Sequence, residues 1–271
     1  MALRIGYSLT YAFEQPTPMI VLLNVHYSRA SDLVSPDTMI TAPSTLYTSY
    51  RDSFGNWCNR LVAPAGVMRI SADTVIRDDG APDELAPDAA QSAVEALPEE
   101  TLVYLMPSRY CESDRLVELA WQLFGATPPG WARVQAVSTW VHQNITFGYE
   151  WARPGKTAWD ALQEGRGVCR DFAHLGVAFC RALNVPARYC TGYLADIGVV
   201  APLTPMDFSG WFEAYLGGRW YTVDPRNLVP RIGRVLIARG RDAADVAITT
   251  TFGPNELRDF QVWTEPVILP G

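Results

Sequence analysis

One segment near the middle of the chain restricts the fold more than any other, because it combines a loop, a helix and an abrupt stop. Gly165 and Gly167 interrupt any preceding helix and allow close backbone approach. Apolar side chains then recur with helical spacing, and Asn184 and Pro186 end the run. The apolar positions are Phe172, Leu175, Gly176, Phe179, Cys180 and Leu183. The pattern predicts a helix that packs its apolar face beside a sheet.

Cys169 falls in the first turn of this predicted helix. Free backbone N–H groups and the positive end of the helix dipole stabilise a thiolate there, so we expect a lowered pKa, to which Arg166 and Arg170 would add. Counting back three residues from Phe172 places Cys169 beside the apolar stripe, with its sulfur facing a cleft. A small buried cysteine is the alternative interpretation. The glycines at the helix start favour a nucleophile.

Two aromatic-rich strands are predicted downstream, over residues 208–216 and 219–223, joined by a Gly217-Gly218 turn. Asp224 ends the second strand. In a Cys/His/Asp arrangement the acid orients the imidazole, so a carboxylate at this strand end has the required placement.

These segments together resemble the transglutaminase-like superfamily of bacterial thiol enzymes. The resemblance is carried by the runs 167–175, 186–189 and 192–194, with Val223-Asp224-Pro225 similar to the third motif of the family. It covers roughly residues 101 to 225, and the first 80 residues look like the small β-rich domain that often precedes this core. The resemblance implies a papain-like core with a Cys nucleophile on a helix, a His on the next strand and an Asp on the following one. Cys169 matches the nucleophile and Asp224 the acid.

The middle motif departs from the family pattern. Asp-x-His-Ala-Trp followed by Glu is usual, and this chain has Asp207 to Glu213 in that place, with Ser209 at the histidine position. We expect the matching segments to supply substrate contacts through Asp207, Trp211 and Tyr193.

No other residue is a convincing replacement for the base. His174 lies about 140° round the helix from Cys169. His142 is expected to satisfy carbonyls at a helix end, and His26 to lie in a strand. Asp207 shares a strand face with Ser209 but lies about 6 to 7 Å along it, which makes it a poor substitute.

Two functions from different classes follow. The first is a thiol enzyme with an incomplete triad, a cysteine peptidase, amide hydrolase or acyltransferase that uses Cys169 on a peptide or protein substrate. General acid–base catalysis contributes about 10² to 10⁴ in rate, so amide cleavage without a base should be badly impaired. The alternative is an inactive pseudoenzyme that keeps the cleft to bind a peptide or protein.

Composition limits the location and partners. With 22 basic and 29 acidic residues the net charge is −7, which argues against a nucleic acid or an anionic membrane as partner. No signal peptide and no apolar run of about 18 residues is found, so we expect a cytoplasmic protein. Five cysteines without paired CxxC spacing indicate free thiols, with no disulfide framework and no zinc site. No motif for a cofactor is present.

The whole pattern predicts an α+β fold with three parts: a β-rich domain over residues 1–80, an acidic Pro/Ala-rich linker with one short helix over 81–100, and the core over 101–271. Strict alternation of apolar residues from Ile5 to Phe13 and from Val21 to Tyr27 indicates the first strands. In the core, helices over 113–125 and 131–144 should wrap the Cys169 helix, and further strands should follow Asp224.

Overall fold

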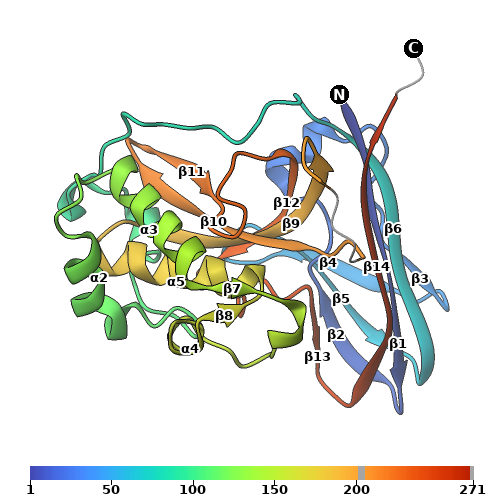
Figure 1. Cartoon of the computed structure of the whole chain (residues 1–271). Helices are drawn as coiled ribbons and strands as arrows, with labels where there is room; N and C mark the ends of the chain where they lie inside the picture. Colours follow the sequence, from blue (N-terminus) through green and yellow to red (C-terminus); the bar gives the residue numbers. More distant parts are fainter. Residues whose placement is uncertain (201–204, 269–271) are drawn as a thin grey trace.

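The structure is a computed structural model that describes residues 1–200 and 205–268. Helices gather on one side of the molecule and two strand layers on the other, with a third sheet between them (Figure 1). Within the described residues, none of the helices has both the length and the apolar composition needed to cross a membrane.

Two antiparallel sheets form the β-rich side. Their strand orders are β14-β1-β6-β3 and β13-β2-β5-β4. The alternation predicted for the first strand is confirmed, because Ile5, Tyr7 and Leu9 are buried. The strands are β1 (Ala2–Phe13), β2 (Thr17–Val21), β3 (Ile40–Ala42), β4 (Tyr47–Arg51), β5 (Trp57–Ala63), β6 (Gly66–Arg77), β13 (Thr249–Thr251) and β14 (Asn255–Val267).

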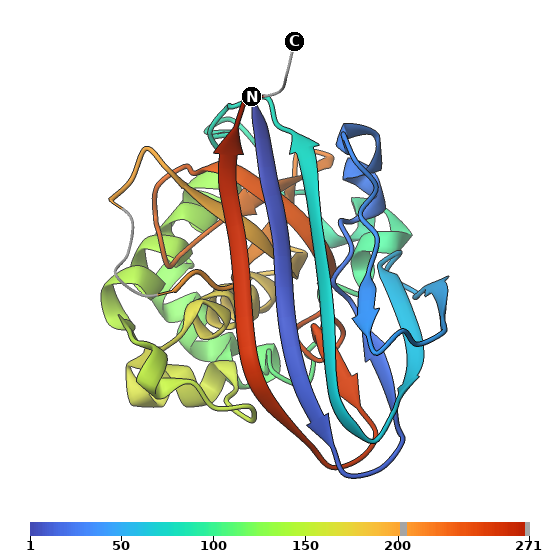
Figure 2. The same cartoon turned by 90° about the vertical axis from the view of Figure 1, so that its right-hand side faces the viewer.

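The end of the chain completes these two sheets, which the predicted boundaries did not anticipate. β14 pairs along the whole of β1, from Ala2 opposite Val267 to Phe13 opposite Asn255, and β13 pairs with β2. Figure 2 shows β14 in red beside β1 in blue. Without β14, the outer edge of β1 would expose unpaired backbone groups. Residues 249–267 therefore belong with the sheets of the first part, and the division at 80 and 100 into separate domains stays a prediction.

The third sheet, of order β11-β10-β9-β12, separates the helices from the β-rich side (Figure 1). The predicted hairpin is confirmed, since Leu216 pairs with Arg219 across the Gly217-Gly218 turn, whose φ values are both positive. The strands are β9 (Ala187–Ile197), β10 (Ser209–Leu216), β11 (Arg219–Val223) and β12 (Ile232–Gly240).

Helix α5 (Cys169–Ala182) packs on this sheet as predicted, and three other helices surround it. Every residue of α5 from Asp171 to Ala182 is buried, so the helix is enclosed on all sides rather than on one apolar face. The surrounding helices are α2 (Val117–Phe124), α3 (Trp131–Asn144) and α4 (Ala158–Glu164). Strands β7 (Thr146–Phe147) and β8 (Arg166–Gly167) pair beside the start of α5.

The predicted linker is attached to the surface of the core. The Ala89 carbonyl accepts from the Trp131 N–H, and the Ala90 carbonyl accepts from the Gly217 N–H, at 2.9 and 2.8 Å. The segment crosses from β6 to the helices in Figure 1 and contains a 3₁₀ turn and the short helix α1 (Glu99–Leu102). Further 3₁₀ turns are Tyr27–Asp32, Ser113–Leu116 and Tyr149–Trp151.

Two apolar cores result, one on each side of the third sheet. Tyr189 and Tyr193 of β9 contribute to the core on the β-rich side. Phe212 and Ala214 of β10 contribute to the core beneath α5. The sheet is therefore fixed from both faces, which makes its strand ends a rigid support for the start of α5.

Candidate active site

The first turn of α5 is closed by a residue of its own third position. The Val168 N–H donates to the Asp171 carboxylate at 3.0 Å, which satisfies a backbone group at the helix entrance. Strand β8 approaches so closely that a Cβ on Gly167 would lie 2.7 Å from the Cβ of Asp171. The run Gly-Val-Cys-Arg-Asp thus places Cys169 as the first helical residue.

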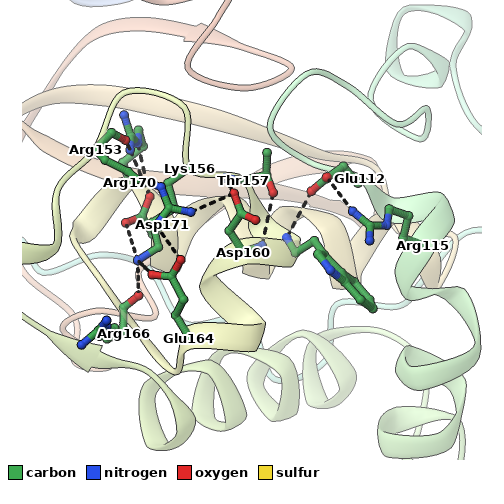
Figure 3. Close-up of polar contacts among 11 residues, drawn as sticks. Glu112, Arg115, Arg153, Lys156, Thr157, Asp160, Glu164, Arg166, Arg170 and Asp171 are labelled. Atoms are coloured by element: carbon green, nitrogen blue, oxygen red, sulfur yellow. Dashed lines mark hydrogen bonds and ion pairs between the residues drawn. The ribbon is translucent and has the colours of Figure 1, made fainter.

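A network of ion pairs around the buried Lys156 and Asp171 side chains supports this helix start (Figure 3). The Lys156 side chain is fully buried, and its ammonium donates to the Arg166 carbonyl at 2.6 Å and to Glu164 at 2.9 Å. It lies 4.0 Å from the Asp171 carboxylate, to which Arg170 donates at 3.2 Å. Burial nevertheless raises the pKa of Asp171. Lys156 was not predicted, although one lysine among 21 arginines was a signal.

The Cys169 thiol lies between two hollows and is half-buried. The larger hollow has a volume of about 420 Å³ and the smaller about 60 Å³. Five residues line both: Tyr149, Cys169, Asp207, Phe208 and Ser209. The structure therefore brings together three of the predicted site residues, Cys169, Ser209 and Asp207.

The predicted lowering of the Cys169 pKa is wrong. Burial raises the pKa of this thiol to about 11, and the negative charge of Asp207 raises it further. The Gly210 N–H and the charge of Arg226 lower this pKa, and Asp224 adds a small upward shift. The helix dipole does not compensate because the thiol is enclosed beside a carboxylate. At neutral pH the group is a thiol.

Gly210 allows β10 to approach the start of α5. A Cβ at this position would lie 2.6 Å from the Tyr189 hydroxyl and 3.3 Å from the Arg170 backbone nitrogen. The glycine thus leaves room for the Tyr189 hydroxyl, and Gly210, Tyr189 and Cys169 all line the larger hollow. Burial raises the pKa of Tyr189 far above its ordinary value, so its phenol stays a neutral donor.

Asp224 lies buried after β11, where its carboxylate is fully engaged. It accepts from the Asn227 N–H at 3.1 Å and the Asn227 side-chain amide at 2.8 Å, and from the Arg234 guanidinium at 3.0 Å. Arg234 also forms two hydrogen bonds with Asp83 of the segment that follows β6, at 3.0 and 2.9 Å. Asp224 lines a different hollow from those at Cys169. The predicted acid is present, and an arginine is its partner.

The other two predicted substrate contacts lie away from the hollows at Cys169. The Trp211 side chain is 1% exposed and lies beneath the Arg234 guanidinium, 4.5 Å from it. Tyr193 is 2% exposed, and its ring packs in a T-shaped arrangement with that of Phe208, with 5.2 Å between the ring centroids. Neither lines the two hollows.

All three histidines have structural partners. The Nδ1 of His142 donates to the carbonyls of Pro225 and Arg226 at 3.0 and 3.1 Å, so the helix-end histidine satisfies loop carbonyls after Asp224. The Nε2 of His174 accepts from the Ala243 N–H at 3.1 Å. His26 caps the 3₁₀ turn Tyr27–Asp32 instead of lying in a strand. None of the three lines a hollow at Cys169.

Two residues at the site were missed by sequence reasoning. Arg226 lines the smaller hollow, with its guanidinium 4.2 Å from the Phe147 ring and bonded to Asn227 at 2.8 Å. Tyr149 stands on the rim of both hollows. The position of Arg226 directly after Asp224-Pro225 was the available signal. Among the residues that the structure places, no group of three or more His, Cys, Asp or Glu side chains is arranged to hold a metal ion.

Comparison with known proteins agrees with this arrangement. The sequence pattern of the transglutaminase-like superfamily matches residues 118–225. The crystal structure of a "putative cysteine protease" from Cytophaga hutchinsonii is 32% identical, with a TM-score of 0.85 over 100% of this chain and 92% of that one. The chain belongs to the transglutaminase-like superfamily, and the α+β fold predicted from the resemblance is confirmed.

Mycobacterial proteins are related over different spans. An uncharacterized protein of Mycobacterium leprae is 24% identical over 257 residues, which is 90% of each chain. An uncharacterized protein of Mycobacterium tuberculosis is 35% identical over 123 residues, which is 40% of this chain and 38% of that protein.

Proposed function

We propose that the protein is a thiol acyl-transfer enzyme in which Cys169 is the nucleophile and the acyl group arrives on a good leaving group, such as a thioester or an activated ester. The observation that carries this proposal is the position of Cys169: it is the first residue of α5, and it lines both hollows beside Ser209.

The reaction follows from the groups at the sulfur. The Cys169 thiolate attacks the carbonyl carbon, the bond to the leaving group breaks, and a thioester on Cys169 forms. The Tyr189 hydroxyl and the backbone N–H groups at the start of α5 donate to the developing oxyanion. Water or another acceptor then attacks the thioester and releases the thiol.

The absence of an imidazole limits the substrate. A thiolate or phenolate leaves without a proton, whereas an amine has to be protonated as it leaves. By the sequence resemblance Ser209 matches the family's histidine position, it lines the hollow beside Cys169, and a neutral hydroxyl is a poor proton donor for this step. We therefore expect amides to react slowly. A peptide or protein acyl donor remains our expectation, supported by the protease description of the Cytophaga protein.

A second function has one observation in its favour. Asp224 is paired with Arg234, so the acid that would orient an imidazole is used in a structural ion pair. A pseudoenzyme that binds a peptide or protein in the hollows would keep the fold with this loss.

Acylation by an activated ester distinguishes the two functions. We expect p-nitrophenyl acetate to give a burst of nitrophenolate and one acetyl group on Cys169, found by mass spectrometry of the digested protein. A peptide p-nitroanilide should turn over at least about 10²-fold more slowly. Cys169→Ala should lose the burst, whereas Cys180→Ala, which removes a buried thiol, should retain it. A folded protein that never acetylates Cys169 would instead be the pseudoenzyme.

A further inference from the structure

The larger hollow at Cys169 has an uneven charge. Among the described residues that line it, Asp207 is the carboxylate and Arg153 and Arg170 are the cations. Both arginines already pair with carboxylates of the network behind α5, at 2.5 and 3.2 Å. The two cations are therefore neutralised, and the hollow is left with the charge of Asp207.

Asp207 has no comparable partner among the described residues. Its carboxyl accepts one hydrogen bond, from the backbone N–H of Phe208 at 2.6 Å, and no basic side chain of residues 1–200 or 205–268 forms an ion pair with it. Residues 201–204 are Ala, Pro, Leu and Thr, none of which is basic. Asp207 is an exposed residue that lines both hollows, so a ligand can reach it, and partial burial of its carboxyl raises its pKa.

The groups on the other side of the sulfur do not cancel this charge. In the smaller hollow Arg231 pairs with Asp196 at 3.3 Å, which leaves Arg226 as the opposing cation. Asp207 acts on the Cys169 thiol more strongly than Arg226 does, and Asp224 acts in the same direction as Asp207. The sulfur therefore lies in a net negative field.

We propose that the larger hollow takes a substrate that carries a positive group, a primary ammonium or a guanidinium, and that Asp207 pairs with it. This inference rests on the proposed function, because it assigns the substrate class of the same site. The walls suit a long cationic side chain: apolar atoms can cover its hydrocarbon stem while its charged end reaches the exposed carboxylate. Those walls include Tyr149, Ala152, Pro154 and Ile248.

Pairing also changes the nucleophile. A cation bound at Asp207 cancels the charge that disfavours the thiolate, so a correctly charged substrate promotes deprotonation of Cys169, and the proton passes to solvent. A neutral or anionic acyl donor leaves the thiol protonated. Asp207 would thus select the substrate and link its binding to the reactivity of the sulfur.

Charged thiol reagents test this without a known substrate. We would measure Cys169 modification by three methanethiosulfonates of similar size, with trimethylammonium, hydroxyl and sulfonate ends. In each, the thiolate attacks the sulfenyl sulfur, a mixed disulfide forms and methanesulfinate leaves. Relative to 2-mercaptoethanol, the cationic reagent should react about tenfold faster than the anionic one, and 1 M salt should reduce this preference.

Asp207→Asn is the decisive variant. It should bring the cation-to-anion ratio to within about twofold of that for 2-mercaptoethanol and should speed the neutral reagent several-fold, since the field at the sulfur is weaker. Glu150→Gln is the matched control, because it removes an exposed carboxylate beside Tyr149 that lines neither hollow, and it should retain the preference. A preference that persists in Asp207→Asn, or is absent in the parent protein, would overturn the inference.

Failure of this inference and failure of the proposed function give different results. If Cys169 is modified ahead of the other four cysteines without any charge preference, the nucleophile stands and the cationic substrate is wrong. If no reagent modifies Cys169 ahead of the buried thiols, the proposed function itself is wrong.

Discussion

Cys169 and Asp224 each adjoin a network of buried charges, and the two networks affect them in opposite ways. Around Lys156 the charges satisfy one another behind the helix start, and Cys169 remains free at the hollows. Around Arg234 the guanidinium pairs with Asp224 itself. The Lys156 network supports the helix start that carries Cys169 without binding its thiol, whereas the Arg234 network binds the Asp224 carboxylate directly.

This difference is consistent with the incomplete triad that we propose. If Ser209 takes the place of the family's histidine, Asp224 has no imidazole to orient, and a buried carboxylate without a partner is costly. Arg234 supplies the missing positive charge and ties Asp224 to Asp83. Under the proposed function, Cys169 is available for chemistry at the hollows, whereas Asp224 stabilises the fold through its pair with Arg234.

The largest effect is expected from removing the guanidinium. Arg234→Met leaves the buried Asp224 carboxylate and the partly buried Asp83 carboxylate without their cation, so the free energy of unfolding should fall by about 3–5 kcal/mol in urea denaturation. Arg219→Gln, which breaks the exposed pair with Glu84, should change it by less than about 1 kcal/mol. Equal effects of the two substitutions would show that Arg234 does not compensate Asp224.

Lys156→Met should be somewhat milder. Asp171 keeps its ion pair with Arg170, and Glu164 is partly exposed. We therefore expect the free energy of unfolding to fall by about 2–4 kcal/mol, somewhat less than the ~3–5 kcal/mol typical of a broken buried ion pair. Because this network holds the start of α5, the ester burst at Cys169 should also decrease. A variant with normal stability and a normal burst would show that the Lys156 network does not position Cys169.

Restoring the histidine should create amidase activity. Ser209→His is expected to raise hydrolysis of a peptide p-nitroanilide by about 10², the lower end for general acid–base catalysis, because Arg234 still holds Asp224. Ser209→Ala is the control and should give no gain. No gain from a folded Ser209→His protein with a normal ester burst would mean that the hollows do not admit an imidazole beside the sulfur.

The smallest expected effect is the change in the alkylation rate of Cys169 with each pH unit. Because the thiolate is the nucleophile and burial raises the pKa of Cys169 to about 11, the rate of alkylation by iodoacetamide should increase with pH and decrease as pH falls. Between pH 7 and pH 9 we expect about tenfold per pH unit, with a plateau only above the pKa. A plateau near pH 7 would indicate a thiolate already formed by the helix dipole.

Local sequence patterns predicted the elements of the core well. The helical spacing after Cys169, the alternation from Ile5 and the Gly217-Gly218 turn each depend on neighbours in the chain, so α5, β1 and the β10–β11 hairpin were all predictable. The pairing of β14 with β1 joins residues more than 240 positions apart, and no local pattern records such a contact.

Motif positions gave Cys169, Ser209 and Asp224 as candidates, and the structure brings the first two to one hollow while Asp224 lines another. Their electrostatics could not be predicted. The direction of the Cys169 pKa shift depends on the enclosure of the sulfur and on the placement of Asp207, which only the folded chain determines. Arg234, the partner of Asp224, comes from β12, and Lys156, the more distant of the two cations at Asp171, comes from the loop before α4, so neither of these ion pairs could be predicted from the sequence.

The order in which the five cysteines react is the most direct test of the claim that Cys169 is the nucleophile. One equivalent of iodoacetamide at pH 8.5, followed by peptide mapping, should modify Cys169 first, because the other four thiols are buried and the reagent cannot reach them. Modification of any of those four ahead of Cys169 would contradict it.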